Sequence, residues 1–459
     1  MFKYLYISLL ALIFTACSMQ PKLNLDEKEL IQSSFKDYEK SDKKSFEKLD
    51  SSDFILDESL KKIVNLALLN NKDLNIALLK IDRAKALYGI ETSNLFPKID
   101  ANGSLDRTKA SDNTNPNNRI SNNYKANVTA SFELDLFGKN QSLNLAAKNS
   151  FLATKYAYNS TKIVLISQTI SSYFNLLSNI ENRNLATKIL ENLNEVYTLT
   201  SKKYSIGASS KDEMLASLAS LKEMENKILD FENEIEKSIN ALELLISSKL
   251  PDDILKNSFL DSLYLKSLNY NIDSKILLNR PDIKEYEFKL KEKNANIGAA
   301  RAAFFPTISL TASTGYASSS LNGLFNSNNS FWEFRPSITL PIFSAGANIK
   351  RLKYSKVEQE IALKEYQKSI QTAFKEVNDA LAIRKNIDLK VKNHKELLEA
   401  LENSYNIALN SYKIGHGSYL NMLISQRAFI NAKINHTNLY KDELENRVLL
   451  FKVLGGELN

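Results

Sequence analysis

Alternating apolar and polar residues mark two pairs of segments as β-hairpins. From 124 to 135 the alternation is almost strict, a period of two that predicts a strand with one apolar and one polar face. A second strand is expected over 98–108, and two more over 307–318 and 331–342, with a long polar loop inside each pair. Each strand has roughly a dozen residues, near the length that a tilted strand needs to cross a bilayer.

The same alternation separates the side chains of the strands into two classes. In a sheet that crosses a membrane, the aromatic and aliphatic face meets lipid and the polar face lines a lumen. Because open sheet edges are not tolerated in hydrocarbon, and four strands cannot close a barrel alone, the chain is expected to oligomerise. The residues expected to face the lumen are Lys125, Asn127, Thr129, Glu133, Glu333 and Arg335.

A very long helix is expected after each hairpin, over 139–206 and 348–414. Apolar residues follow the alternating spacing of four and three residues that is typical of a coiled-coil seam, as at Ile163, Ile166 and Ile170. At 1.5 Å per residue each helix would be about 100 Å long. Such long and polar helices are expected to lie in an aqueous compartment.

Each long helix is expected to end at a glycine, after which the chain turns back. Gly207 and Gly415 can adopt the left-handed conformation that ends a helix, and the helices that return are expected over 210–248 and 418–454.

Other helical patterns flank the first hairpin and join the two halves. One helix is expected from Asp57 to about Leu95, where Pro97 ends it. Between the halves, apolar residues around Leu265 suggest a short strand, and Pro281 opens the next helix at its first turn.

The two halves of the chain repeat one pattern about 208 residues apart. Gly89 precedes Pro97 by eight residues, as Gly298 precedes Pro306, and Tyr204-Ser205-Ile206-Gly207 is matched by Tyr412-Lys413-Ile414-Gly415. A repeat of this length indicates two structural halves with internal pseudo-twofold symmetry. The expected organisation is a lipoprotein signal peptide (1–16), a lipidated tether (17–52), a first repeat (53–250), a linker (251–280) and a second repeat (281–459).

Composition supports long, uninterrupted elements and argues against nucleic-acid binding. The 459 residues include only 12 glycines and 8 prolines, and 25% are charged. The net charge is +7, from 60 basic and 53 acidic residues, and it is spread over both halves. Because no basic block stands out, solvated helix faces explain the charge better than a nucleic-acid site.

The N-terminus has the pattern of an export signal that ends in a lipidation site. Lys3 precedes an apolar run that is too short to span a membrane. Cys17, the only cysteine, directly follows Thr15-Ala16. This arrangement resembles a bacterial lipobox, in which the cysteine thiol receives a diacylglyceryl group, although Phe14 replaces the usual leucine. Ser18 follows, and the resemblance to lipoproteins that avoid aspartate at this position implies sorting to the outer membrane. The alternative is a chance cysteine in a cleaved signal.

Five motifs together resemble the TolC-like outer-membrane efflux lipoproteins, the outer membrane factors of tripartite pumps. They are Leu278–Asp282, Gly298–Pro306, Leu340–Phe343, Tyr412–Gly415 and Leu454–Gly456. The resemblance implies a mainly α-helical duct with a membrane β-barrel: a homotrimer with four strands per protomer in a 12-stranded barrel, and long periplasmic coiled-coil helices. It implies no cofactor. Its partners would be outer-membrane lipid, a periplasmic adaptor and an inner-membrane pump of the RND or ABC type.

The resemblance also implies a closed tip at the turn of the second repeat. Leu420 falls where related lipoproteins have an apolar constriction ring, and Arg427 falls at a tip-stabilising arginine. Positions that carry acidic rings in relatives hold Asn421 and Ile424 here, which argues against an acidic gate built from this repeat.

The corresponding turn of the first repeat carries two acidic residues instead. Asp212 and Glu213 could supply negative charge at the tip, or they could simply stabilise a helix N-terminus.

No catalytic or metal site is expected in this sequence. His394, His416 and His436 are isolated on separate stretches, and no glycine-rich phosphate loop is present. His416, between two glycines, is either a pH sensor or an ordinary surface histidine. The expected function is an efflux duct for drugs or other small molecules; a type I protein-secretion duct or a structural coiled-coil surface lipoprotein are the alternatives.

Overall fold

The computed structural model describes residues 19–23, 54–109, 120–254, 260, 265 and 274–456. The expected signal peptide, Cys17 and nearly all of the tether lie outside the described residues. The chain divides into two compact units, of which the first contains Met1–Asp26, Lys80–Lys155 and Lys284–Lys368, and the second Glu27–Leu79, Tyr156–Ile283 and Ser369–Asn459. The long helices α6 (Lys139–Ser205) and α9 (Ala347–Lys413) contribute residues to both units.

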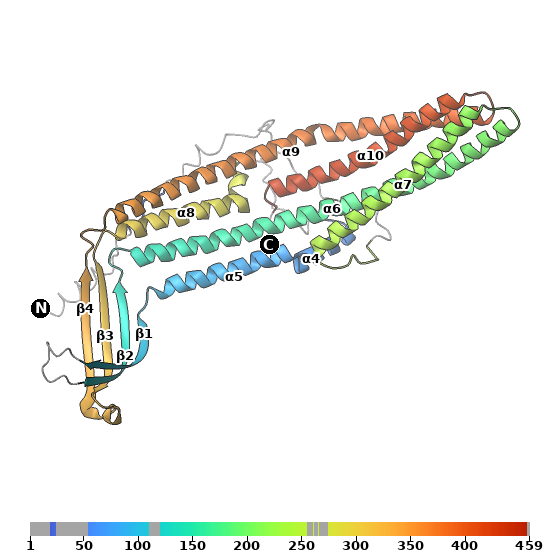
Figure 1. Ribbon diagram of the computed structural model, residues 1–459. Helices are drawn as coiled ribbons and strands as arrows, with labels where there is room; N and C mark the ends of the chain where they lie inside the picture. The colour runs from blue at the N-terminus through green and yellow to red at the C-terminus, as the bar shows by residue number, and fades with distance from the viewer. Residues whose placement is uncertain are drawn as a thin grey trace. The chain divides into compact units, whose positions relative to one another are not determined.

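A four-stranded antiparallel sheet characterises the first unit (Figure 1). Its order is β1 (Lys98–Lys109), β2 (Ile120–Leu134), β3 (Thr307–Ser318) and β4 (Ser330–Thr339). The central pairing, β2 with β3, joins the hairpin of the first repeat to that of the second.

Two strand ends differ from the expectation by more than one residue. β2 begins at Ile120, four residues before the apolar alternation starts, because its polar beginning still pairs with the end of β1. The Thr108 and Ser121 hydroxyl oxygens lie 2.8 Å apart across this extension. β4 ends at Thr339 instead of continuing to Ile342, since Pro341 has no N–H to donate to a ladder.

Two helices lead into the strands along the chain: α5 (Lys72–Ser93) precedes β1, and α8 (Pro281–Ala302), which begins at the expected proline, precedes β3. The helix expected from Asp57 to Leu95 is in fact two, since α4 (Glu58–Asn70) ends at Asn71. The Asn71 N–H donates to Ala67 O at 2.9 Å, and the Asn71 side-chain oxygen accepts from the Leu74 N–H at 3.0 Å. One asparagine therefore ends α4 and caps α5, which a helical periodicity alone does not reveal.

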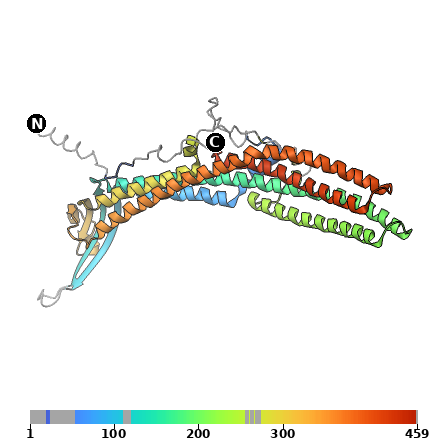
Figure 2. The ribbon, with the colours of Figure 1, turned by 90° about the horizontal axis from the view of Figure 1, so that it is seen from above.

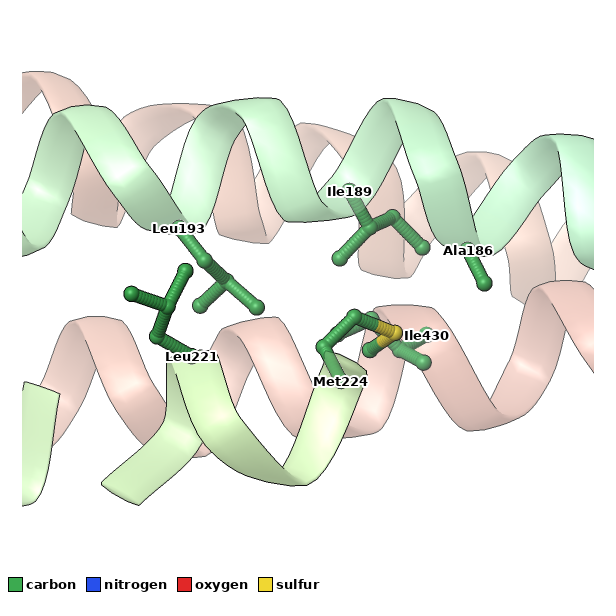
Figure 3. Packing of buried hydrophobic residues seen from close by; sticks show 6 residues of the cluster. All are labelled: Ala186, Ile189, Leu193, Leu221, Met224 and Ile430. Carbon is green, nitrogen blue, oxygen red and sulfur yellow. The ribbon is translucent and has the colours of Figure 1, made fainter. Parts of the chain in front are cut away.

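The second unit contains α4, α7 (Lys211–Ile246) and α10 (Tyr419–Val453), together with the later parts of α6 and α9. Apolar side chains of α6, α7 and α10 interlock along their seam (Figure 3); they are Ala186, Ile189, Leu193, Leu221, Met224 and Ile430. In two views, the turns that follow α6 and α9 lie at the same end of this unit (Figures 1 and 2).

Between the two repeats, the described residues include a 3-10 helix, η2 (Ser274–Asn279), and a single β-bridge between Leu265 and Ile55. Among the residues that the structure describes, every helix is too short or too polar to cross a membrane.

Candidate functional site

The register of the sheet brings the polar side chains of all four strands to one face. Thr129 pairs with Asp100 of β1 and with Ser313 of β3, and Ser313 pairs with Glu333 of β4. Directly paired residues share a face, so the polar alternations of the separate strands coincide. The six residues expected to face a lumen all lie on this polar face: Lys125, Asn127, Thr129, Glu133, Glu333 and Arg335.

Hydrogen bonds and ion pairs connect the side chains of the polar face. The Asn127 Nδ2 donates to Thr129 Oγ1 at 2.8 Å and to Ser313 Oγ at 2.7 Å. Glu333 forms an ion pair with Arg335, and the Glu133 carboxylate accepts from Lys139 at 3.2 Å. Both signs of charge are present, which makes the face hydrophilic without a strong bias toward one ion type.

The opposite face of the sheet is apolar and uncovered in the single chain. Trp332 is 81% exposed and Ile99 is 72% exposed. Further large apolar side chains that are more than a third exposed are Leu105, Val128, Phe334 and Ile338. A contiguous apolar surface of this kind marks contact with another molecule or with lipid.

The sheet ends in two open edges. In the described part of the chain, β1 pairs only with β2, and β4 pairs only with β3. The outer backbone groups of both edge strands need partners wherever water is absent. The sheet is therefore a segment of a larger structure.

Two matching turns lie at one end of the second unit. Gly207 and Gly415 adopt left-handed backbone angles, with φ of 76° and 82°. After each, a serine caps the returning helix: Ser210 Oγ accepts from the Glu213 N–H at 3.1 Å, and Ser418 Oγ accepts from the Asn421 N–H at 3.2 Å.

A buried contact between the two repeats supports these turns, and the sequence did not reveal it. The hydroxyl oxygens of Tyr412 and Thr200 are 2.8 Å apart. Lys203 donates to the Tyr412 carbonyl at 3.0 Å and lies 4.2 Å from the centre of its ring. Burial raises the pKa of the Tyr412 hydroxyl, so it stays neutral and able to donate. The only sequence signal for this contact was the repeated motif Tyr412-Lys413-Ile414-Gly415, which contains the tyrosine.

The residues expected at the gate form an exposed stripe along the first two turns of α10. Leu420 and Ile424 are one turn apart and are 62% and 58% exposed, and Asn421 is exposed beside them. Arg427 continues the stripe and donates to Glu223 of α7 at 3.3 Å, an ion pair in which both side chains are exposed. Two large apolar side chains therefore lie in solvent at this helix end, and exposed apolar surface of this kind can mark a contact site.

The acidic residues of the first repeat differ from each other in their surroundings. Asp212 is exposed. Glu213 accepts from the Ser209 hydroxyl at 2.6 Å while its backbone N–H is held by Ser210. Glu213 therefore takes part in the helix start, where a negative charge is favourable.

Comparison with known proteins places these features in a family. The family model described as outer membrane efflux protein matches residues 63–248 and 273–456. The chain belongs to the outer membrane efflux protein family. The two matched segments contain the two hairpins and the helices that follow them.

Individual members are similar along nearly the whole chain. The solvent efflux pump outer membrane protein SrpC of Pseudomonas putida is 36% identical over 408 residues, which cover 88% of this chain and 87% of SrpC. The cation efflux system protein CusC of Escherichia coli is 35% identical over 405 residues, 88% of each chain. The open-state structure of the Neisseria gonorrhoeae MtrE outer membrane channel matches with a TM-score of 0.87 and 31% identity, over 96% of this chain and 99% of MtrE.

These similarities confirm several expectations from the sequence. The chain has the TolC-like fold, mostly helical with four strands, and is an outer-membrane efflux duct with a large periplasmic part. Other members of the family are channels.

The motif Leu278–Asp282 of this efflux protein has a structural role that the sequence did not indicate. Arg280 is buried, and its Nε and Nη2 donate to the two oxygens of Asp282 at 3.0 and 2.7 Å. Its Nη2 also lies 2.7 Å from Glu376 of α9, and its Nη1 donates to Val453 O at 2.8 Å. Burial opposes the charge, but the two carboxylates outweigh it and raise the pKa of Arg280. One guanidinium thus joins α8, α9 and the end of α10.

The expectation that all three histidines are isolated was wrong for two of them. The rings of His394 on α9 and His436 on α10 stack with centroids 6.2 Å apart. His394 and His436 lie far apart in the sequence, and only the folding of the chain brings their rings together. His416 lies exposed in the turn after α9. No cluster of three or more metal-ligating side chains occurs among the described residues.

Proposed function

We propose that three copies of this chain close one 12-stranded barrel in the outer membrane, four strands from each copy. The observation that carries this proposal is the sheet register, which gives one continuous polar face and one exposed apolar face. Joining β4 of one copy to β1 of the next supplies partners to both open edges, as hydrocarbon demands. The polar face then lines a water-filled lumen and Val128, Trp332 and Ile338 meet lipid.

The duct conducts its substrates passively and is not an enzyme. The described residues of the polar face carry both signs of charge together with hydroxyl and amide groups. Energy therefore comes from partners: a periplasmic adaptor and an inner-membrane pump of the RND or ABC type, as in a tripartite system.

The substrates that fit this duct are drugs or other small organic molecules. SrpC is named for solvents and CusC for cations, at nearly equal identity to this chain. A path dedicated to metal cations would be favoured by a cluster of metal-ligating side chains. The described residues contain no group of three or more histidine, cysteine, aspartate or glutamate side chains that could hold a metal ion. A type I protein-secretion duct is less favoured, because the similar proteins are named for efflux.

Cys17 is the lipid anchor of the mature protein in this proposal, after removal of residues 1–16, and residues 17–52 form its tether. Cys17→Ser is expected to abolish incorporation of radiolabelled palmitate, since no other cysteine exists in the chain. The signal would also remain attached, which raises the mass of the purified chain. Palmitate labelling equal to that of the unsubstituted protein would exclude this anchor.

The tip at Gly207 and Gly415 is the periplasmic gate in this proposal. Leu420 and Ile424 are exposed on one side of α10, and a threefold axis beside them would gather three apolar side chains at each level. Such a ring resists wetting and closes the channel to ions. Asn421 lies on the same stripe, while Arg427 and Glu223 join α10 to α7 within one chain.

Leu420→Asp tests this gate. Three carboxylates about 6 Å apart repel each other by roughly 1–3 kcal/mol per pair at effective dielectric constants of 80 to 20, which favours an open tip. Single-channel conductance in planar bilayers is expected to rise, with trimers still formed.

Two controls accompany this experiment. Thr198→Ala removes an exposed hydroxyl that bonds only its own helix at Asn194 O, and conductance should not change. Arg427→Ala removes an exposed ion pair worth at most about 1 kcal/mol, and should raise conductance less than Leu420→Asp. Unchanged conductance in Leu420→Asp would place the constriction elsewhere, with Asp212 and Glu213 as the next candidates.

A further inference from the structure

Residues 19–23 lie against α8. Asn294 Nδ2 donates to Pro21 O at 2.9 Å, and Arg301 Nη1 donates to Met19 O at 3.1 Å. Both donors come from one helix and both acceptors from a five-residue segment, 19–23. The segment is thus held at two points by its backbone, so the contact depends little on its own side chains.

Gly298 makes this close approach possible. A Cβ atom at this position would lie 3.1 Å from the Gln20 N, 3.2 Å from the Gln20 Cα and 2.6 Å from Ser142 Oγ. Atoms this close require a shift, and the nearest atoms of the segment are backbone. Asn294, Gly298 and Arg301 are four and three residues apart, which puts them on one face of the helix.

In the described part of the first repeat, the corresponding positions make no equivalent contact. Gly89 corresponds to Gly298 in the repeat, yet a Cβ there would meet no atom within 4 Å. Thr92, which corresponds to Arg301, is neutral and accepts a hydrogen bond from Asn144 of α6 at 2.7 Å. Because the two glycines share their place in the repeat but not their surroundings, Gly298 has a role that duplication alone does not explain.

We propose that Asn294, Gly298 and Arg301 form a seat for residues 19–23, which sets the position of the lipid-bearing N-terminus. Cys17 is two residues before Met19, so chain connectivity keeps their Cα atoms within about 8 Å of each other. α8 ends at Ala302, and β3 begins at Thr307, so the seat lies near the end of the sheet where β3 starts (Figure 1). The lipid is thereby held where the sheet enters the membrane.

The lipid part of this proposal rests on the proposed modification of Cys17, whereas the seat itself does not. A lipidated Cys17 has no free thiol, so the purified unsubstituted chain should not react with a maleimide. A reaction would overturn lipid positioning and the proposed anchor together, and the seat would still be tested in a Cys17→Ser background.

A spin label on the exposed residue 22 measures whether the segment is seated. The full-length chain carries Lys22→Cys with a nitroxide, and Gly298→Leu is compared with Gly89→Leu. The label is expected to move slowly in the otherwise unsubstituted chain and in Gly89→Leu, and to become mobile in Gly298→Leu. A label that is equally mobile in all three chains, or equally immobile in all three, would overturn the seat.

A second pair of variants removes the hydrogen bonds without adding volume. Asn294→Ala combined with Arg301→Ala is expected to speed trypsin cleavage after Lys22 by roughly tenfold or more, because each lost hydrogen bond contributes about 0.5–1.5 kcal/mol and 1.4 kcal/mol is tenfold. This measurement decides the question if Gly298→Leu fails to fold. Cleavage at an unchanged rate in the double variant would contradict the proposal.

Discussion

Val128→Arg is expected to prevent assembly of the barrel in the outer membrane. Val128 lies near the middle of β2 on the apolar face, where it is paired with Ala101 and Thr314. An arginine on the lipid side of a strand costs about 2–4 kcal/mol near the bilayer midplane, and each trimer would contain three. The amount of heat-modifiable trimer in outer-membrane fractions measures the effect.

Thr129→Arg is the matched control, because threonine and valine have similar shapes and the two positions are neighbours on β2. Thr129 lies on the polar face and contacts Asn127 and Ser313. Its replacement loses hydrogen bonds worth about 1 kcal/mol each, but the new charge remains in water. Assembly should therefore be largely retained. Equal loss of trimer in both variants would mean that the two faces of the sheet do not differ in environment.

Arg280→Ala is expected to destabilise the folded chain by about 3 kcal/mol. The substitution leaves Asp282, Glu376 and Val453 O without their shared donor. Removing one partner of a buried ion pair costs about 3–5 kcal/mol, and the lower end applies because both carboxylates are partly exposed. The midpoint of urea unfolding in detergent, followed by circular dichroism, measures the change.

Two further variants serve as controls for Arg280→Ala. Arg280→Lys keeps the positive charge but changes its geometry, and Arg427→Ala removes an ion pair that is exposed. Lysine keeps the charge but cannot serve both oxygens of Asp282 and a carbonyl at once, so an intermediate loss of stability is expected. Arg427→Ala removes an exposed ion pair, and the midpoint should move little. An unfolding midpoint for Arg280→Ala that equals that of Arg427→Ala would contradict the structural role of Arg280.

The elements of this protein could be predicted from the sequence, but most pairings could not. The strict alternation in β2 assigned Thr129 and Val128 to opposite faces, yet it contains no information about which residue of β3 lies beside them. The cap at Asn71 was missed because a helix pattern continues through it. Gly207 and Gly415 were identifiable because the left-handed turn after a helix requires glycine.

In the candidate site, too, single residues could be predicted from the sequence but their contacts could not. Leu420 and Arg427 could be proposed from motif position alone, whereas the contact of Thr200 with Tyr412 joins residues 212 positions apart. No local pattern marks such a pair. Gly298 and Gly89 looked equivalent in the sequence, and only the fold shows that a chain segment lies against one of them.

The central claim is that the polar face of the sheet lines an aqueous lumen and the apolar face meets lipid. Single cysteines placed at each position from 124 to 134, in the Cys17→Ser background and in liposomes, can be tested with a membrane-impermeant maleimide. Odd-numbered positions, which lie on the polar face, are expected to react quickly, and even-numbered positions in the middle of the strand slowly. Reaction at similar rates on both faces would contradict the account.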